Sequence, residues 1–178
     1  MINLNPIVKT LHLRGIKRRF CIFLVNHIFC GTRFWSAKRR LLNSIGFQIG
    51  ENTKVVGPID CPATLVVGKN CWIGKNLIGN GNGTIQIGDN CDIAPEVSFL
   101  TGGHEIGGHD RRAGKGEIYN ITVGNGVWIG SRSTILKSVT IGDGSVIAAC
   151  SCVHKDVEAD CLVAGVPAKV VRKLDNVR

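Results

Sequence analysis

Large apolar side chains return at every sixth residue over much of the chain. From Ile87 the series is Ile87, Ile93 and Phe99, followed after a gap by Val123, Ile129, Ile135, Ile141, Ile147 and Val153. The next position along the chain is usually glycine or alanine. An earlier tract keeps the same spacing in another phase, at Ile49, Val55, Cys61, Val67 and Ile73. A segment rich in glycine and asparagine, residues 76–83, separates the two tracts.

A six-residue period fits neither an amphipathic helix nor a single alternating strand. It fits short strands joined by turns, with one large side chain per strand directed inward. Three such strands make one triangular coil of about 18 residues, and stacked coils bond to one another through parallel strands. Glycine, asparagine and aspartate at 88–90, 124–126 and 142–144 suit the corners. The pattern therefore predicts an all-β domain, a parallel β-helix over residues 46–167.

The repeat fails between Phe99 and Val123, where Glu105, Arg111 and Glu117 occupy the inward phase. Charged side chains are costly in an apolar interior, so we expect residues 101–119 to leave the coil as a protruding loop. Long loops on a rigid scaffold are often functional.

The repeat ends at Pro167, which has no N–H to donate to a ladder. Beyond it, Val170, Val171 and Leu174 have helical spacing. This spacing predicts a short capping helix over residues 168–178.

Five motifs, in this order, resemble the hexapeptide-repeat acyltransferases and most closely their galactoside/maltose acetyltransferase branch. They are IGDNCDIAP at 87–95, TGGH at 101–104, VWIGS at 127–131, IGDGSVI at 141–147 and GVPAKVVR at 165–172. The resemblance is close over residues 87–172 and loose over residues 46–86. It implies a left-handed β-helix, a homotrimer with active sites between subunits, acetyl-CoA as acyl donor and no metal.

The resemblance implies that His104, at the root of the predicted loop, is the catalytic base. Histidine titrates near neutral pH and suits that role. The alternative is a solvated loop histidine, and Glu105 is a candidate for orienting the ring. A covalent acyl-enzyme on Cys150 or Cys152 is less favoured, because their repeat positions suit packing.

The family pattern also implies a donor site, made of Ser131, Ala149, His154, Lys155, Lys169 and Arg172. Small side chains at 131 and 149 leave room for the pantetheine arm, and cations suit the phosphates of the coenzyme. For Lys169 and Arg172 the alternative is a solvated basic helix face. Cations in the loop, Arg111, Arg112 and Lys115, are either solvated or attract an anionic acceptor.

The formal net charge of +9 is concentrated at one end of the 178-residue chain. Residues 1–50 hold nine Lys and Arg and no Asp or Glu, whereas residues 51–178 hold thirteen of each sign. Mixed with apolar residues, these cations predict a basic amphipathic helical segment over residues 1–45. It either lies peripherally on an anionic membrane surface, where it would favour lipid-linked acceptors, or caps the first coil. No nucleic-acid-binding module is recognisable.

Several features predict a cytoplasmic location. No apolar run approaches the roughly 20 residues of a membrane-spanning helix, and the first residues lack the order of a signal peptide. The eight cysteines form no recognisable disulfide framework.

The leading expectation is an acetyl-CoA-dependent O-acetyltransferase that acts directly on a sugar hydroxyl. The acceptor would belong to a cell-surface polysaccharide (O-antigen, capsule or exopolysaccharide) or its precursor. An N-acetyltransferase on an amino sugar or nucleotide sugar would use the same donor site. A metalloenzyme of the γ-carbonic anhydrase type needs three gathered histidines, but only His104 and His109 share the loop. A non-catalytic scaffold would not need TGGH together with Lys169 and Arg172.

Overall fold

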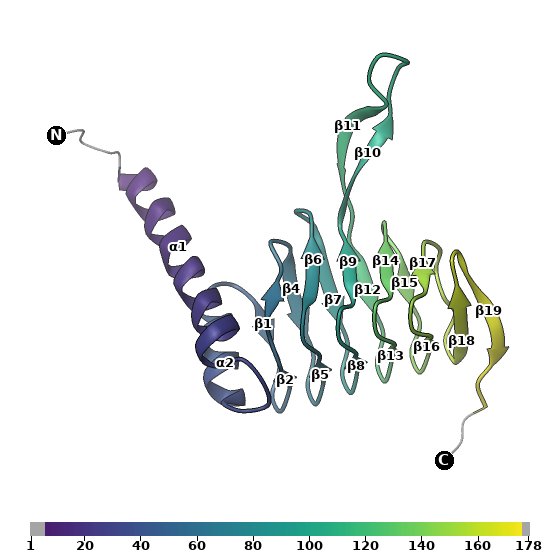
Figure 1. The fold of residues 1–178 in the computed structure, drawn as a ribbon, viewed down its shortest axis with the longest axis horizontal. Coiled ribbons are helices and arrows are strands. Elements are labelled where there is room, and N and C mark those ends of the chain that lie inside the picture. The colour runs from purple at the N-terminus through teal and green to yellow at the C-terminus, as the bar shows by residue number, and fades with distance from the viewer. Residues whose placement is uncertain (1–5, 176–178) are drawn as a thin grey trace.

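The computed structural model describes residues 6–175, with side chains from residue 14 onward (Figure 1). Helices come first: α1 (Pro6–Phe23), the π-helix η1 (Leu24–Ile28) and α2 (Trp35–Asn43). Strands follow to the end of the described chain. The outermost parts of the predicted terminal segments, residues 1–5 and 176–178, lie outside the described residues.

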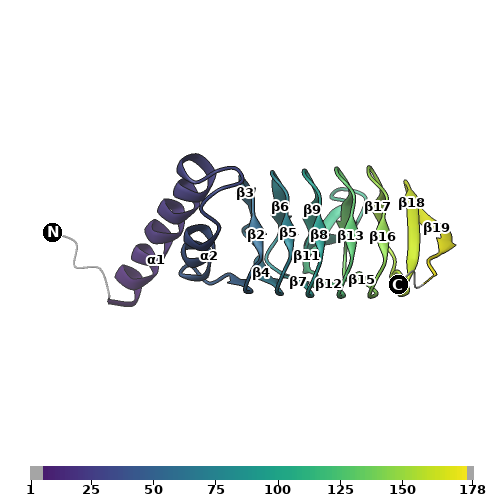
Figure 2. The same ribbon diagram turned by 90° about the horizontal axis from the view of Figure 1, so that it is seen from below.

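Three sheets form the sides of a triangular prism, and Figure 2 shows its coils stacked along one axis. Sheet A contains β1 (Gln48–Ile49), β4 (Thr64–Val67), β7 (Thr84–Ile87), β12 (Ile121–Val123) and β15 (Thr140–Ile141). Sheet B contains β2 (Lys54–Val55), β5 (Trp72–Ile73), β8 (Asp92–Ile93), β13 (Trp128–Ile129), β16 (Val146–Ile147), β18 (Cys161–Gly165) and β19 (Ala168–Lys173). Sheet C contains β3 (Ile59–Asp60), β6 (Leu77–Asn80), β9 (Ser98–Leu100), β14 (Thr134–Leu136) and β17 (Cys152–Val153).

The six-residue pattern forms the inside of this prism. Every apolar position of both tracts is buried, from Ile49 to Val153. Neighbouring coils are in register, so that Ile129 lies between Ile93 and Ile147 in sheet B. The predicted parallel β-helix is therefore confirmed.

Asparagines build one of the corners between strands. Asn52, Asn70 and Asn90 all have φ near +57°, between 56° and 58°, a left-handed conformation that asparagine adopts more readily than most residues. Their side chains form a ladder, with Nδ2 of Asn52 donating to Oδ1 of Asn70 at 3.2 Å and Asn70 to Asn90 at 3.3 Å. The corner residues thus also bond one coil to the next.

The helices close the first coil. Val25 and Leu42 are fully buried in the common core. The Asn26 amide donates to the Ile59 carbonyl and accepts from the Ile59 N–H, both at 2.9 Å. One face of this segment therefore caps the prism, which was one of the two roles expected of it.

A buried lysine fastens the cap. Nζ of Lys38 donates to the carbonyls of Gly31 at 2.6 Å and Val56 at 3.2 Å, and lies 4.2 Å from the centroid of the Trp35 ring. The side chain is fully buried, and this burial lowers the pKa of the Lys38 ammonium to about 8. Among residues 6–175, no helix has both the length and the apolar character to span a membrane.

The predicted C-terminal helix over residues 168–178 is wrong. Ala168–Lys173 forms β19, antiparallel to β18 at the edge of sheet B. Pro167 does interrupt the stacking, but the chain then turns back, and its backbone groups pair with an edge that would otherwise stay open. The β-branched residues Val170 and Val171 favour a strand as well.

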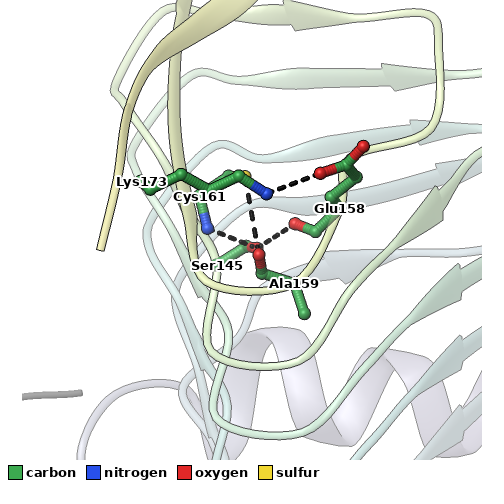
Figure 3. A network of polar contacts seen from close by, with 5 residues as sticks. All are labelled: Ser145, Glu158, Ala159, Cys161 and Lys173. Carbon is green, nitrogen blue, oxygen red and sulfur yellow. Dashed lines mark hydrogen bonds and ion pairs between the residues drawn. The ribbon is translucent and has the colours of Figure 1, made fainter. Parts of the chain in front are cut away.

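Polar contacts hold β19 to the last coil (Figure 3). Nζ of Lys173 pairs with Oε2 of Glu158 at 2.5 Å. The coil below is fixed in turn, because Oγ of Ser145 donates to the Glu158 carbonyl at 2.7 Å and accepts from the Cys161 N–H at 3.2 Å. The ion pair raises the pKa of Lys173 and lowers the pKa of Glu158.

Candidate active site

The interruption of the repeat forms a β-hairpin instead of an irregular loop. β10 (Gly102–Ile106) pairs antiparallel with β11 (Ala113–Ile118). The hairpin projects from the prism between β9 of sheet C and β12 of sheet A (Figure 1). Glu105 and Arg111 are exposed on it, so the charged residues avoid the interior as their phase predicted.

Thr101 anchors the root of the hairpin. Its side chain is fully buried, and Oγ1 donates to the Asn80 carbonyl at 2.9 Å and accepts from the Gly83 N–H at 3.2 Å. The N–H of Tyr119, on the returning strand, donates to the Thr101 carbonyl at 2.8 Å. Both strands of the hairpin therefore start from a fixed point on the β-helix.

His104 lies just beyond this root, with an exposed side chain. Its Nδ1 lies 2.9 Å from the carbonyl oxygen of Gly114 on the opposite strand. A carbonyl can only accept, so Nδ1 carries the hydrogen, and Nε2 of the neutral ring has an unshared electron pair. Within residues 14–175, no hydrogen bond joins Glu105 to this ring. The hairpin backbone, not Glu105, orients His104.

The strand that carries His104 packs tightly on an aromatic ring. A Cβ at Gly103 would lie 2.7 Å from Cε2 of Tyr119, closer than carbon atoms normally approach. The Tyr119 hydroxyl donates to the Glu117 carboxylate, which raises the pKa of Tyr119. Glycine at 103 thus lets the His104 strand lie directly on Tyr119.

A cleft of about 560 Å³ opens beside His104. Asn80 and Asn82 lie on its β-helix side, Glu117 and Ile118 on the hairpin side, and Leu100 between them. Sequence reasoning missed these lining residues. The available signal was the segment rich in glycine and asparagine at residues 76–83, which separates the two tracts of the repeat.

The predicted donor residues lie along two edges of the prism. Ser131 and Ala149 follow β13 and β16 on successive coils, between sheets B and C, and the Cys150 N–H donates to the Ser131 carbonyl at 2.9 Å. Lys169 pairs with Ala164 at the end of the same edge. Arg172 is further along β19, opposite Leu162.

His154 and Lys155 are on a different edge. They follow β17 and lie between sheets C and A, the side from which the His104 hairpin projects. Sheet C separates them from Ser131 and Ala149. One chain therefore does not bring all six predicted donor residues around a single coenzyme.

Three of these residues are exposed cations. Lys155, Lys169 and Arg172 are exposed, and none of the three forms an ion pair with a carboxylate within residues 14–175. Neighbouring cations do, as in the 2.7 Å pair between Arg132 and Glu96. The three cations are thus available to an anionic ligand.

Other candidate sites contain few or none of the predicted site residues. His109 lies at the exposed tip of the hairpin, where Nδ1 is 3.5 Å from a carboxylate oxygen of Asp110. A larger groove of about 830 Å³ lies between α2 and sheet B, beside Trp35 and Trp72, but no predicted site residue lines it. Among the side chains that the structure describes, residues 14–175, no three His, Cys, Asp or Glu are grouped as a metal site.

Comparison with known proteins agrees with this geometry. Residues 120–155 match the family model described as bacterial transferase hexapeptide (six repeats), and residues 64–94 match the hexapeptide repeat of succinyl-transferase. The galactoside O-acetyltransferase of Escherichia coli K12 is 40% identical over 147 residues, which cover 78% of this chain and 70% of that protein.

Solved structures of acetyltransferases also align with this chain. A galactoside acetyltransferase in complex with coenzyme A aligns with a TM-score of 0.77 and 30% identity, over 97% of this chain and 86% of that chain. A polySia-specific acetyltransferase aligns with a TM-score of 0.62 and 29% identity, over 74% of this chain and 63% of that chain. The fold is the left-handed parallel β-helix of these enzymes. The chain belongs to the hexapeptide-repeat acyltransferase family, in the group that includes galactoside O-acetyltransferase.

Proposed function

We propose that this protein transfers the acetyl group of acetyl-CoA to a hydroxyl of a carbohydrate, with His104 as the general base. The observation that carries the proposal is the hydrogen bond between Nδ1 of His104 and the Gly114 carbonyl. It leaves Nε2 ready to accept a proton, at the edge of a cleft of about 560 Å³, which has room for a small ligand. The relatives support the donor, since one of them is a galactoside acetyltransferase solved with coenzyme A.

The reaction is a direct transfer. Nε2 of His104 takes the hydroxyl proton while the acceptor oxygen attacks the thioester carbon. Hydrogen-bond donors in the cleft, among them the amides of Asn80 and Asn82, stabilise the oxyanion or hold the acceptor. The carbon–sulfur bond then breaks, and His104 returns its proton to the coenzyme sulfur. The products are an acetyl ester and coenzyme A, with His104 neutral again.

A homotrimer would complete the donor site. His104, His154 and Lys155 lie along one edge of the prism, and Ser131, Ala149 and Lys169 along the next. A neighbouring copy that places its second edge against the first edge would gather both groups around one coenzyme. The small residues would flank the pantetheine arm, and the unpaired cations would meet the phosphates.

We propose a cell-surface polysaccharide or its precursor as the acceptor. The cleft lies at the base of a projecting hairpin and His104 is exposed, so an extended glycan can pass the base without being enclosed. Exposed cations on the hairpin, Arg111, Arg112 and Lys115, favour an acidic chain. One of the aligned structures is that of a polySia-specific acetyltransferase, which supports a polysaccharide acceptor. We propose that the reaction takes place in the cytoplasm.

The test is release of thiol from acetyl-CoA in the presence of candidate acceptors. The panel contains free sugars, amino sugars, nucleotide sugars, lipid-linked glycans, and neutral and acidic polysaccharides. We expect an acidic glycan to give the highest kcat/KM and an alkali-labile ester as product. An alkali-stable amide would show N-acetylation instead, and no thiol release with any acceptor would contradict the proposal.

A further inference from the structure

Helix α1 has apolar side chains on two opposite faces. On one face Cys21 is buried, with Sγ 3.8 Å from Oγ of Ser44. Val25, just beyond the helix, continues this face and is fully buried in the core. On the other face Ile16, Phe20 and Phe23 are 51%, 60% and 52% exposed. Steps of four and three residues place these three side chains in one stripe along the helix. Capping the coil explains the first face and leaves the second without a partner among the side chains of residues 14–175.

The position of α1 leaves this stripe accessible. Figures 1 and 2 show α1 extending away from the prism beyond the first coil. Two further large apolar side chains, Ile28 and Phe34, are exposed near the turn between η1 and α2. Exposed apolar surface of this extent usually marks a contact with another molecule or a membrane.

The charges beside the stripe are all of one sign. Lys17 and Arg19 are exposed on its two flanks, and residues 1–50 contain no Asp or Glu. Arg18 has another role, because Nη2 donates to the Cys61 carbonyl at 2.6 Å and the guanidinium lies 4.9 Å from the centroid of the Phe47 ring. Nζ of Lys17, although exposed, also donates to the Ser44 carbonyl at 2.9 Å. Arg18 and Lys17 therefore both fasten the helix to the rest of the protein, while Arg19 faces solvent.

We propose that the α1 stripe, Ile16, Phe20 and Phe23 with Lys17 and Arg19 on its flanks, binds the surface of an anionic lipid bilayer. Apolar side chains would enter the region between headgroups and acyl chains, and the cations would meet the lipid charges. A second copy fits this face less well, because it would bring cations against cations. The helix would lie in the plane of the interface and hold the acetyltransferase at the membrane.

This inference does not rest on the proposed reaction, because lipid binding is measured without acetyl-CoA or acceptor. The experiment is cosedimentation of the full chain with vesicles. One set contains phosphatidylglycerol mixed with phosphatidylcholine, and the other contains phosphatidylcholine alone. We expect binding to the anionic vesicles, weakened by added salt, and little binding to the neutral ones.

Two pairs of substitutions separate the apolar and charged contributions. Phe20→Ser with Phe23→Ser should weaken binding about 10- to 30-fold, because two large side chains lose their buried area. Lys17→Gln with Arg19→Gln should weaken it about 25-fold, since each cation near an anionic surface contributes roughly a factor of five. Val171→Ser is the matched control. It alters a residue 60% exposed, like Phe20, but at the opposite end of the prism, and binding should not change.

Several results would overturn the proposal. Wild-type protein that ignores anionic vesicles, or binds both kinds equally, lacks the inferred surface. The same holds if both pairs of variants bind like wild type. Light scattering is the second measurement. If Phe20→Ser with Phe23→Ser lowers the mass of the assembly but leaves vesicle binding intact, the stripe is a contact between copies.

Discussion

One methyl group added at Gly103 should slow the reaction by disturbing the strand that carries His104. A Cβ at this position would lie 2.7 Å from Cε2 and 2.9 Å from Oη of Tyr119. Carbon atoms normally stay about 3.5–4.0 Å apart, so the strand or the ring must move by about 1 Å. A displacement of that size at a catalytic group can lower turnover about 100-fold.

Stability should fall much less than activity. Overpacking typically costs about 1–3 kcal/mol, which for a chain of this size lowers Tm by roughly 2–12 °C. The assays are kcat and KM from thiol release, together with thermal unfolding of Gly103→Ala. Gly108→Ala is the matched control, because no atom lies within 4 Å of a Cβ added there, in the same hairpin. It should behave like wild type.

Removing the obstructing ring should restore part of the activity. In Gly103→Ala combined with Tyr119→Leu, the branched side chain leaves more room, so the two changes should not be additive. Unchanged turnover and unchanged Tm in Gly103→Ala alone would refute the reasoning, because neither the strand nor the ring would then need its observed place.

Three further predictions concern the cap and the donor site. Because burial lowers the pKa of Lys38 to about 8, below its unfolded value of about 10.4, the unfolded chain binds more protons between these values. The free energy of unfolding should therefore rise with pH from about 8 to 9.5, and Lys38→Met should flatten this rise in pH-dependent denaturant titrations. Deleting residues 1–40 should cause aggregation or a lower Tm, because it uncovers the core side chains that Val25 covers; a soluble, fully stable fragment would contradict the capping role. Lys169→Ala with Arg172→Ala should raise KM for acetyl-CoA more than it lowers kcat, and an unchanged KM would remove both residues from the donor site.

The interior of the β-helix could be predicted because the local six-residue spacing alone shows which side chains point inward. A large apolar residue at every sixth place, as at Ile129 and Ile147, leaves few other ways to bury them all. Charges in the inward phase, such as Glu105, also predicted where the chain leaves the coil. These features are local, and the structure agrees with them.

The edges of the fold could not be predicted in the same way. The spacing of Val170, Val171 and Leu174 suits one face of a helix, but the open edge of β18 decides the outcome, and that edge exists only in the folded protein. Corners posed a similar problem. We expected glycine and asparagine there, yet Glu96 and Arg132 also have φ above +60° and form an ion pair between adjacent coils.

At the His104 site, the residue itself could be predicted from the sequence, but its contacts could not. Its motif singled out the residue, but the partner of its ring is the Gly114 carbonyl, ten residues away across the hairpin. That partner depends on the register of β10 and β11, which is irregular between His104 and Ile106. Asn80 joins the cleft only because β6 and β9 are neighbours in sheet C. No pattern local to either residue carries this information.

The central claim is that His104 takes the proton from the acceptor, and the kinetics of His104→Ala test it most directly. A general base contributes about 10²–10⁴-fold to the rate, so kcat should fall by that factor on the best acceptor found. Binding of acetyl-CoA, measured by calorimetry, should remain, because the proposed donor residues are on other elements. His109→Ala removes an exposed histidine at the tip of the same hairpin and should be nearly neutral. Near-normal turnover of His104→Ala would contradict the account, whereas a loss of 100-fold or more with coenzyme binding intact is the result it predicts.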